Sequence, residues 1–210
     1  QGGVHTPYVM KYPGVIPAGD VCNERIQNID ILPTVLNIAG SEVPVGLDID
    51  GENKWPEIKG EELNTDRELY FEFGYTRSIM VGDYKYIAFR LPDSLMQNLK
   101  NGKVDRMYSI QGKIKDEVAA WRYPHFYEAD QLYNLRVDPG EQTNLAYDPQ
   151  YKDKLNELKE KLKEKLATFD NPFPLDDPDP FYFTEEYDRL CEKARNFDMS
   201  EHYWYAKQCY

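Results

Sequence analysis

The sequence predicts an α+β fold in which an antiparallel sheet packs against one long amphipathic helix. Aromatic and β-branched residues dominate residues 67–73 and 75–90, as in a half-buried sheet. The pair Gly82-Asp83 divides the second run as a hairpin turn would. The helix is predicted over residues 148–169 by a stripe of leucines at helical spacing, namely Leu155, Leu158, Leu162 and Leu166.

The composition indicates a folded protein with no affinity for nucleic acid. The 210 residues are enough for one large domain or two small ones, and 41% of them are hydrophobic, so a packed core can form. A net charge of −12 at pH 7 would repel a phosphate backbone, so no nucleic-acid partner is expected. No apolar run is long enough to span a bilayer, so no membrane span is expected.

The first forty residues predict a strand followed by a helix. Residues 7–13 alternate apolar and polar side chains and end at a Pro-Gly pair, which predicts a short strand and a turn. Residues 28–40 predict a short buried helix, with Asp30 as the N-cap and Gly40 just beyond the C-terminal end. Its apolar face would consist of Ile31, Leu32, Val35, Leu36 and Ala39.

The middle of the chain alternates between loops and short elements. Residues 41–66 are rich in Gly, Pro, Asp and Glu and predict a loop or linker between two parts of the protein. Short helices are expected at residues 92–102 and 116–124, and a strand at residues 131–135. The stretch VDPGEQTNL, residues 137–145, predicts a turn.

The long helix has clear sequence signals at its start. Asp148 is a good N-cap, and Pro149 fits the first helical position. Glu157 and Lys161 are spaced to form an i,i+4 ion pair. The tail that follows is rich in Pro and Asp, then helical over residues 185–197, then aromatic, and we expect it to wrap over the body.

No group of residues in the chain forms a complete catalytic or metal-binding motif. The three histidines are far apart, and no zinc-type spacing occurs. Residues 48–52 (DIDGE) match only the first half of a calcium loop, so an acidic turn is the preferred interpretation. Three cysteines give no disulfide framework; Cys191 and Cys209 would be able to pair, and unpaired thiols are the alternative.

Three stretches, taken in order, resemble the C-terminal part of formylglycine-dependent sulfatases, a family of the alkaline-phosphatase-like superfamily. They are QGGVHTP followed by VMKYPG, then NIDILPTVLNIAG, and finally QLYNLRVDPGEQTNLA ahead of the amphipathic helix. The likeness covers residues 1–170. It implies hydrolysis of sulfate esters, on a sulfated polysaccharide or glycosaminoglycan, by a periplasmic or secreted enzyme.

The same resemblance implies how the chain is divided. Residues 1–40 would be a strand-helix piece at the end of the large α/β domain, and residues 41–66 a linker. Residues 67–170 would form the C-terminal subdomain, a sheet of roughly four antiparallel strands packed on the long helix. Residues 171–210 would be a tail that wraps the body.

The catalytic groups of this family lie in its large domain. That domain supplies a formylglycine nucleophile, made from Cys or Ser, and a calcium site built from Asp and Asn; neither motif occurs in this chain. Cys22 lies in CNERI, with Glu and Ile where the nucleophile motif needs Pro or Ala and Arg, so we reject it. We therefore expect formylglycine and calcium only in an intact enzyme with an N-terminal catalytic domain, and no activity from these residues alone.

The resemblance implies substrate contacts at His5, Tyr75 and Arg77. His5 follows the Gly pair, where many relatives carry Arg, and would bond a sugar hydroxyl or a sulfate. Arg77 would bind a sulfate or carboxylate with two parallel hydrogen bonds, and Tyr75 would stack on a sugar ring. The alternatives are a histidine satisfied beside a strand and an arginine paired with a surface carboxylate.

Two further functions are compatible with the sequence. One is a phosphodiesterase or phosphonate monoester hydrolase of the same superfamily, which can share the DPGE-type ending. The other is a free-standing carbohydrate-binding or assembly module.

Overall fold

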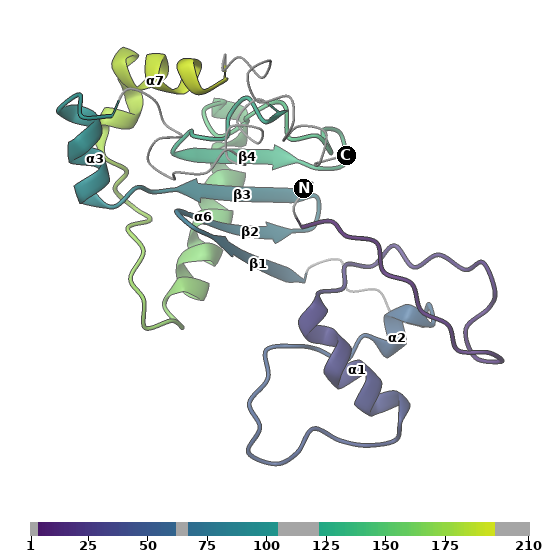
Figure 1. Ribbon diagram of the computed structural model, residues 1–210. Helices are drawn as coiled ribbons and strands as arrows, with labels where there is room; N and C mark the ends of the chain where they lie inside the picture. The colour runs from purple at the N-terminus through teal and green to yellow at the C-terminus, as the bar shows by residue number, and fades with distance from the viewer. Residues whose placement is uncertain (1–3, 62–66, 105–121, 196–210) are drawn as a thin grey trace, which may run out of the picture. The chain divides into compact units, whose positions relative to one another are not determined.

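The computed structural model describes residues 4–61, 67–104 and 122–195, and the chain divides into two compact units (Figure 1). The first unit comprises residues 2–67 and the second residues 68–210. Each unit has its own hydrogen-bond networks.

The second unit is built on a four-stranded antiparallel sheet in the order β1-β2-β3-β4. Its strands are β1 (Glu68–Phe73), β2 (Thr76–Val81), β3 (Tyr84–Phe89) and β4 (Asp130–Asn134). Two-residue turns join the first three strands, and both turns use a glycine with positive φ, 51° at Gly74 and 52° at Gly82. Glycine adopts this backbone conformation without steric cost, so the α+β prediction and the predicted hairpin are confirmed.

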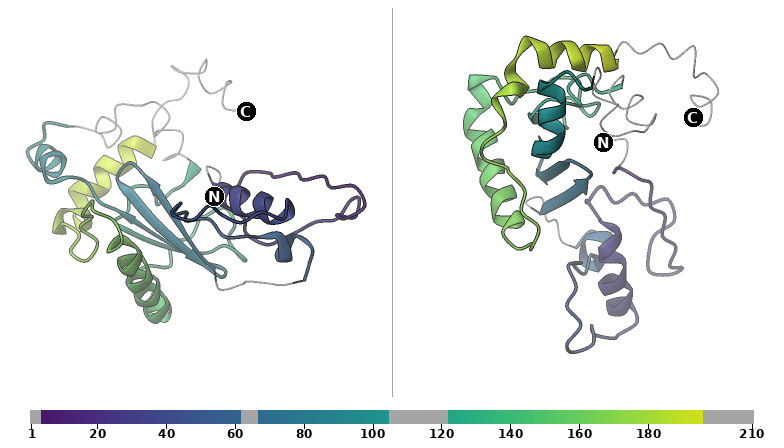
Figure 2. Two further views of the ribbon diagram at one scale, coloured as in Figure 1. Left: turned by 90° about the horizontal axis from the view of Figure 1, so that it is seen from below. Right: turned by 60° about the vertical axis from the view of Figure 1, so that its left-hand side comes forward.

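The long helix α6 (Lys152–Leu166) packs on one face of this sheet (Figure 2). It follows a 3₁₀ turn η2 (Pro149–Tyr151), in which the Asp148 carboxylate accepts a hydrogen bond from the Gln150 amide at 2.9 Å. Leu158 and Leu162 are completely buried. The sheet side of this core is made by Ile79, Tyr86, Ala88 and Leu132. The predicted cap and leucine stripe are therefore confirmed.

The ion pairs on α6 differ from the predicted one. Glu157 pairs with Lys154, and Lys161 reaches across to Glu68 on β1. The prediction of a Glu157–Lys161 pair is wrong, because the tertiary partner Glu68 competes for the same ammonium group. The result is a link between the helix and the edge strand.

A second core lies beside the sheet where three shorter helical elements meet. They are α3 (Asp93–Lys100), η3 (Pro180–Phe183) and α7 (Glu185–Arg195). The buried side chains of this core include Phe89, Met96, Leu99, Tyr127, Tyr182, Tyr187, Leu190 and Cys191. Residues 180–191 of the C-terminal segment thus belong to the core of the second unit.

The turn after β4 protects the outer edge of that strand. The Asn144 side chain accepts a hydrogen bond from the Leu132 amide at 2.8 Å and donates one to the Asp130 carbonyl at 2.9 Å. Glu141 adopts a positive φ of 55°, and its carboxylate pairs with buried Lys85 at 2.7 Å. The predicted turn at residues 137–145 is confirmed, and its side chains complete the hydrogen bonds that an edge strand leaves open.

The first unit contains short helices and extended chain. The helical elements of this unit are η1 (Asn28–Asp30), α1 (Ile31–Ile38) and α2 (Trp55–Ile58). The strand predicted at residues 7–13 is wrong, since these residues form no strand and Val9 is 90% exposed. Alternating side chains alone do not make a strand, because the backbone needs a neighbouring strand to pair with. The predicted turn after them is present, with Gly14 at φ 80°.

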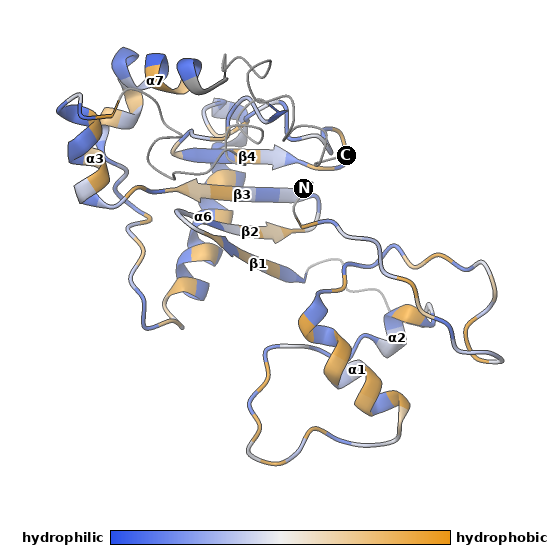
Figure 3. Cartoon of the chain, in the orientation of Figure 1, coloured by the Kyte–Doolittle hydropathy of each residue, from blue (hydrophilic) through white to orange (hydrophobic). Residues whose placement is uncertain are grey.

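Helix α1 does not bury its apolar face within the first unit, so the prediction of a buried helix is wrong. Ile31, Leu32 and Val35 are 40–49% exposed, while the buried residues of α1 are Pro33 and Thr34. In Figure 3, much of the α1 ribbon has the orange colour of hydrophobic residues. The buried side of the helix instead faces a polar network, which begins at Asp30.

Some expected features lie outside the described residues. They are most of the helix at 116–124, the aromatic end of the tail, and Cys209 with its predicted pairing to Cys191. Among the described residues, no helix is both long enough and apolar enough to cross a membrane.

Candidate substrate-contacting residues and a buried ion network

Arg77 stands at the start of β2 and is held by its own hairpin. Its Nη1 donates to the carbonyl oxygens of Gly74 and Thr76, at 3.0 and 2.9 Å. Its Nη2 lies 3.0 Å from the half-exposed carboxylate of Glu72. The side chain therefore pairs with a surface carboxylate, which is the alternative that the sequence left open, and only 8% of the residue is exposed.

The guanidinium of Arg77 also covers an aromatic ring from the C-terminal segment. Its central carbon lies 4.9 Å from the centroid of the Phe173 ring. A cation above a ring face is attracted by the electron-rich centre of that face. Arg77 thus fixes both the β1-β2 turn and the chain at residue 173.

Tyr75 occupies the turn beside Arg77. It is half-buried, and its ring packs against the core that includes Phe89. Its carbonyl accepts a hydrogen bond from the Arg90 amide at 2.9 Å. Tyr75 and Arg77 are therefore neighbours on one hairpin.

His5 is exposed and belongs to the first unit.

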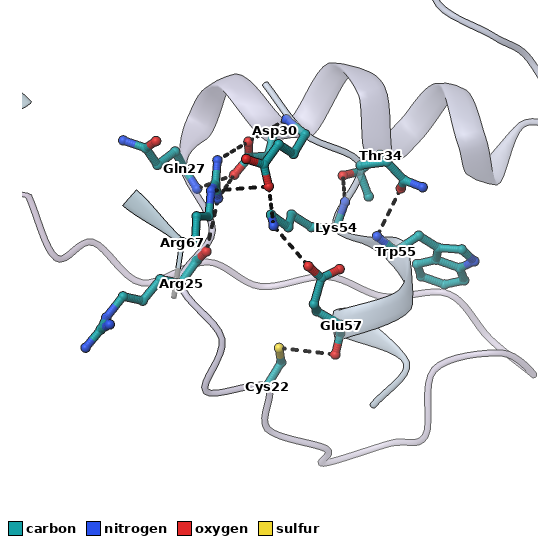
Figure 4. A network of polar contacts seen from close by, with 11 residues as sticks. Cys22, Arg25, Gln27, Asp30, Thr34, Lys54, Trp55, Glu57 and Arg67 are labelled. Atoms are coloured by element: carbon teal, nitrogen blue, oxygen red, sulfur yellow. Dashed lines mark hydrogen bonds and ion pairs between the residues drawn. The ribbon is translucent and has the colours of Figure 1, made fainter. Parts of the chain in front are cut away.

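The first unit contains a buried ion pair that the sequence did not reveal (Figure 4). The Asp30 side chain is completely buried and accepts two hydrogen bonds from Arg67, at 2.6 and 2.7 Å. It also accepts from the amides of Gln27 and Glu52, at 2.7 and 2.9 Å. Asp30 stands at the N-cap position of α1 as predicted, but its carboxylate makes no capping bond to that helix.

The environment of Asp30 stabilises its ionised form. Burial alone would raise the pKa of this carboxyl group. The hydrogen bonds from Arg67 and from the Glu52 and Gln27 amides outweigh burial and hold the pKa of Asp30 below its ordinary value. Asp30 is therefore a charged structural centre.

Lys54 forms the second part of this network. Its Nζ lies 2.6 Å from Glu52 and 2.9 Å from Glu57, while the side chain itself is almost completely buried. Its amide donates to the Thr34 hydroxyl of α1 at 2.9 Å. Burial favours neutral lysine, but the two carboxylates outweigh it and raise the pKa of Lys54. Through these bonds, residues 52–57 are fastened to α1.

Gly51 allows residues 48–52 to approach the 3₁₀ turn η1 closely. A Cβ atom at this position would lie 2.1 Å from the carbonyl oxygen of Ile29. Only glycine fits such an approach, and the next residue, Glu52, donates its amide to Asp30. The acidic stretch DIDGE therefore has a clear structural role beside the ion pair.

A comparable network joins the sheet of the second unit to α6. The carboxylate of Asp130 on β4 accepts from Tyr86 at 2.7 Å, Arg90 at 2.8 Å and Lys159 at 2.6 Å. Burial raises the pKa of Asp130, but Arg90 and Lys159 outweigh it, so the net shift is downward. The Tyr86 hydroxyl, in turn, has a raised pKa because it is buried beside this charge.

The described residues do not assemble a metal centre. No three His, Cys, Asp or Glu side chains among them lie close enough together to hold a metal ion. Cys22 is exposed, and its Sγ lies 3.7 Å from the Glu57 carbonyl oxygen. In the described part of the chain, the charged clusters are paired ions within each unit.

Comparison with known proteins identifies the family. Residues 1–91 match the family model described as N-sulphoglucosamine sulphohydrolase, C-terminal. An ulvan-active sulfatase of Formosa agariphila is 34% identical over 178 residues, which cover 80% of this chain and 33% of that protein. Human arylsulfatase D is 37% identical over 73 residues, which cover 35% of this chain and 12% of the relative.

Two solved structures are also similar. A 2-O GAG sulfatase shares 24% identity with a TM-score of 0.42, covering 73% of this chain and 27% of that one. BT4656, solved with D-glucosamine-2-N,6-O-disulfate, shares 23% identity with a TM-score of 0.44, covering 70% and 25%.

The matches define the chain as a member of the sulfatases. More particularly, it is a C-terminal sulfatase region, as the matching family model is the C-terminal one. The chain spans about a third of the length of the ulvan-active relative.

Proposed function

We propose that this chain is the C-terminal portion of an enzyme that hydrolyses sulfate esters on a sulfated polysaccharide or glycosaminoglycan. The observation that carries the proposal is the similarity to the ulvan-active sulfatase, which extends over 80% of the chain. The 2-O GAG sulfatase belongs to the same class of activity. In this proposal the enzyme works in the periplasm or outside the cell, as the family resemblance implies.

The proposed enzyme has a catalytic domain that this chain does not supply. The apolar face of α1 supports this part of the proposal, since Ile31, Leu32 and Val35 remain 40–49% exposed. Apolar surface of this kind gains free energy when another surface covers it. The catalytic domain would supply that cover and, with it, the formylglycine nucleophile and the calcium ligands.

The chain's own residues would shape the substrate site. His5 is exposed and available for a hydrogen bond to a sugar hydroxyl or a sulfate oxygen. Tyr75 would present part of its ring to a sugar. Arg77 would bind the substrate through guanidinium hydrogen bonds that are not used by Gly74, Thr76 and Glu72. Its bonds to the Gly74 and Thr76 carbonyl oxygens also hold the turn that contains Tyr75.

Substrate choice by the intact protein tests this function. The complete protein encoded by the gene, with its formylglycine formed and calcium present, should release sulfate from a sulfated polysaccharide. A phosphodiester and a phosphonate monoester serve as competing substrates. Preferential cleavage of either competitor would replace the sulfatase with the phosphodiesterase or phosphonate hydrolase alternative. Nothing in the structure or the comparisons supports those alternatives or the free-standing binding module.

A further inference from the structure

His125 lies in the loop that leads into β4, and both nitrogens of its ring face hydrogen-bond acceptors. Its Nδ1 lies 2.6 Å from Oε1 of Glu128, and its Nε2 lies 3.1 Å from the carbonyl oxygen of Gln142. A neutral imidazole carries one N–H group and donates only one of these bonds, whereas the imidazolium ion carries two and donates both. The geometry therefore favours the protonated ring.

The described charged groups around this ring also favour the imidazolium ion. Glu128 from the loop, with Asp138 and Glu141 from the turn at residues 137–145, lies near the buried hydroxyl group of Tyr133. Burial first, and then these three carboxylates, raise the pKa of that hydroxyl group. Lys85 contributes a positive charge but pairs with Glu141 at 2.7 Å. Among these groups, three carboxylates stand against one ammonium group, and a negative surrounding stabilises a cation.

The bond from His125 to Gln142 joins two segments that flank β4. Gln142 belongs to the turn after the strand, and its side chain also donates to the Arg122 carbonyl oxygen at 3.1 Å. The amides of Gln142 and Thr143 both donate to the Asp138 carboxylate at 2.8 Å. His125 thus adds to this turn a bond whose donor depends on a proton.

The bond from His125 to Glu128 connects the ring with the edge of the sheet. The other oxygen of Glu128 accepts from the Asn144 side chain at 2.7 Å. Asn144 completes hydrogen bonds on the outer edge of β4, which is the uppermost strand of the sheet in Figure 1. An open strand edge is a template for pairing with another chain, so this connection helps to keep the edge closed.

We propose that His125 is a pH-sensitive clamp, which as the imidazolium ion holds the turn at residues 137–145 against the loop before β4 and as the neutral ring releases it. Loss of the proton removes one of the two donors, so either Gln142 or Glu128 loses its bond. A histidine whose charged form is stabilised by folding keeps its proton above its ordinary titration point of about 6.5. The contribution of the clamp is therefore fully present below about pH 6.5 and is lost as the pH rises through the folded-state titration point.

Hydrogen exchange of the complete protein encoded by the gene, measured by mass spectrometry from pH 5.5 to pH 9, tests the proposal. The readout is the protection of peptides that cover residues 138–146, corrected for the intrinsic effect of pH on exchange. Protection should fall roughly fivefold as the pH rises, which is the factor that one hydrogen bond of ordinary net strength represents. The midpoint of this fall should lie above about pH 6.5.

Two variants separate the clamp from a merely structural contact. His125→Gln should show lower protection at pH 5.5 and no transition, because glutamine does not titrate. Glu128→Gln removes the negative charge beside the ring and should move the midpoint of the transition to lower pH. His5→Gln is the matched control, because His5 is exposed and belongs to the first unit, and it should keep the transition of the parent protein.

The outcomes that overturn the proposal are equally definite. They are constant protection of the turn across the pH range, a transition that persists in His125→Gln, and an unchanged midpoint in Glu128→Gln. A midpoint at or below about pH 6.5 in the parent protein would also overturn it. Sulfate release is a separate measurement, so this proposal and the proposed function can fail independently.

Discussion

The carboxylate of Asp30 and the guanidinium of Arg67, 37 residues apart, form a doubly hydrogen-bonded ion pair at 2.6 and 2.7 Å. This pair joins two distant positions of the first unit, because Asp30 is the N-cap residue of α1 and Arg67 is the last residue of the unit. Breaking a buried pair on one side leaves an uncompensated charge, which costs more than the pair itself contributes.

Asp30→Asn should therefore destabilise the first unit strongly. The change keeps the shape of the side chain but leaves the guanidinium of Arg67 without its counter-ion. We expect a loss of about 3 kcal/mol or more, seen as faster hydrogen exchange at the amides of residues 28–58. Glu61→Gln is the control, because Glu61 is exposed and pairs only at the surface with Lys59. Equal exchange rates in the two variants would contradict a structural role for the ion pair.

Stability should fall at acid pH through the buried carboxylates. Asp30 and Asp130 both have folded-state pKa values below the ordinary value, which is about 3.9 in an unfolded chain. Their contribution is fully present above that unfolded value and is lost as the pH falls through the folded-state pKa values. Urea unfolding between pH 6 and pH 2 should show that the free energy of unfolding declines as the pH falls. In the Asp130→Asn variant, the free energy of unfolding of the second unit should depend less steeply on pH. If the pH dependence of unfolding is the same in Asp130→Asn as in the parent chain, the ionised Asp130 carboxylate does not contribute to stability as we infer.

Gly51→Ala should disrupt the contact between residues 48–52 and η1. The new Cβ would lie 2.1 Å from the Ile29 carbonyl oxygen, so the backbone must move and the Glu52 hydrogen bond to Asp30 must lengthen. We expect a loss of about 2 kcal/mol or more from such overpacking. Gly140→Ala is the control, since the nearest atom to its Cβ would be a flexible side-chain carbon at 3.5 Å. A Gly51→Ala protein as stable as this control would show that the close approach is not required.

His5→Ala tests the predicted substrate contact in the intact enzyme. If His5 bonds the sugar or the sulfate, the variant should have a raised KM or a reduced kcat/KM. Lys11→Ala, at another exposed position of the same extended segment, is the control and should behave like the parent enzyme. Unchanged kinetics in His5→Ala would leave this histidine without a role in substrate binding.

The sheet and the long helix were predictable because local sequence fixes them. Aromatic and β-branched residues on either side of Gly82-Asp83 predict β2 and β3, and the spacing of Leu158 and Leu162 determines which face of α6 is buried. These signals act over a few residues, so neighbouring residues are enough to reveal them. The sulfatase resemblance was likewise carried by short stretches that stand in a fixed order.

The failures concern interactions between distant residues. The apolar pattern of α1 predicted a buried helix, but its unit buries the polar side around Asp30 and Thr34 instead. The partner of Asp30 is distant in sequence, and no spacing rule connects it with Arg67. The same reason explains why Lys161 pairs with Glu68 on β1 and not with its helical neighbour.

The most direct test of the central claim compares the 210-residue chain with the complete protein encoded by the gene. Both are assayed for sulfate release from an aryl sulfate and a sulfated polysaccharide, with calcium present. A C-terminal sulfatase portion predicts turnover by the complete protein and none above buffer by the 210-residue chain. Turnover by the purified 210-residue chain, or a complete protein that releases no sulfate from either substrate, would contradict the account.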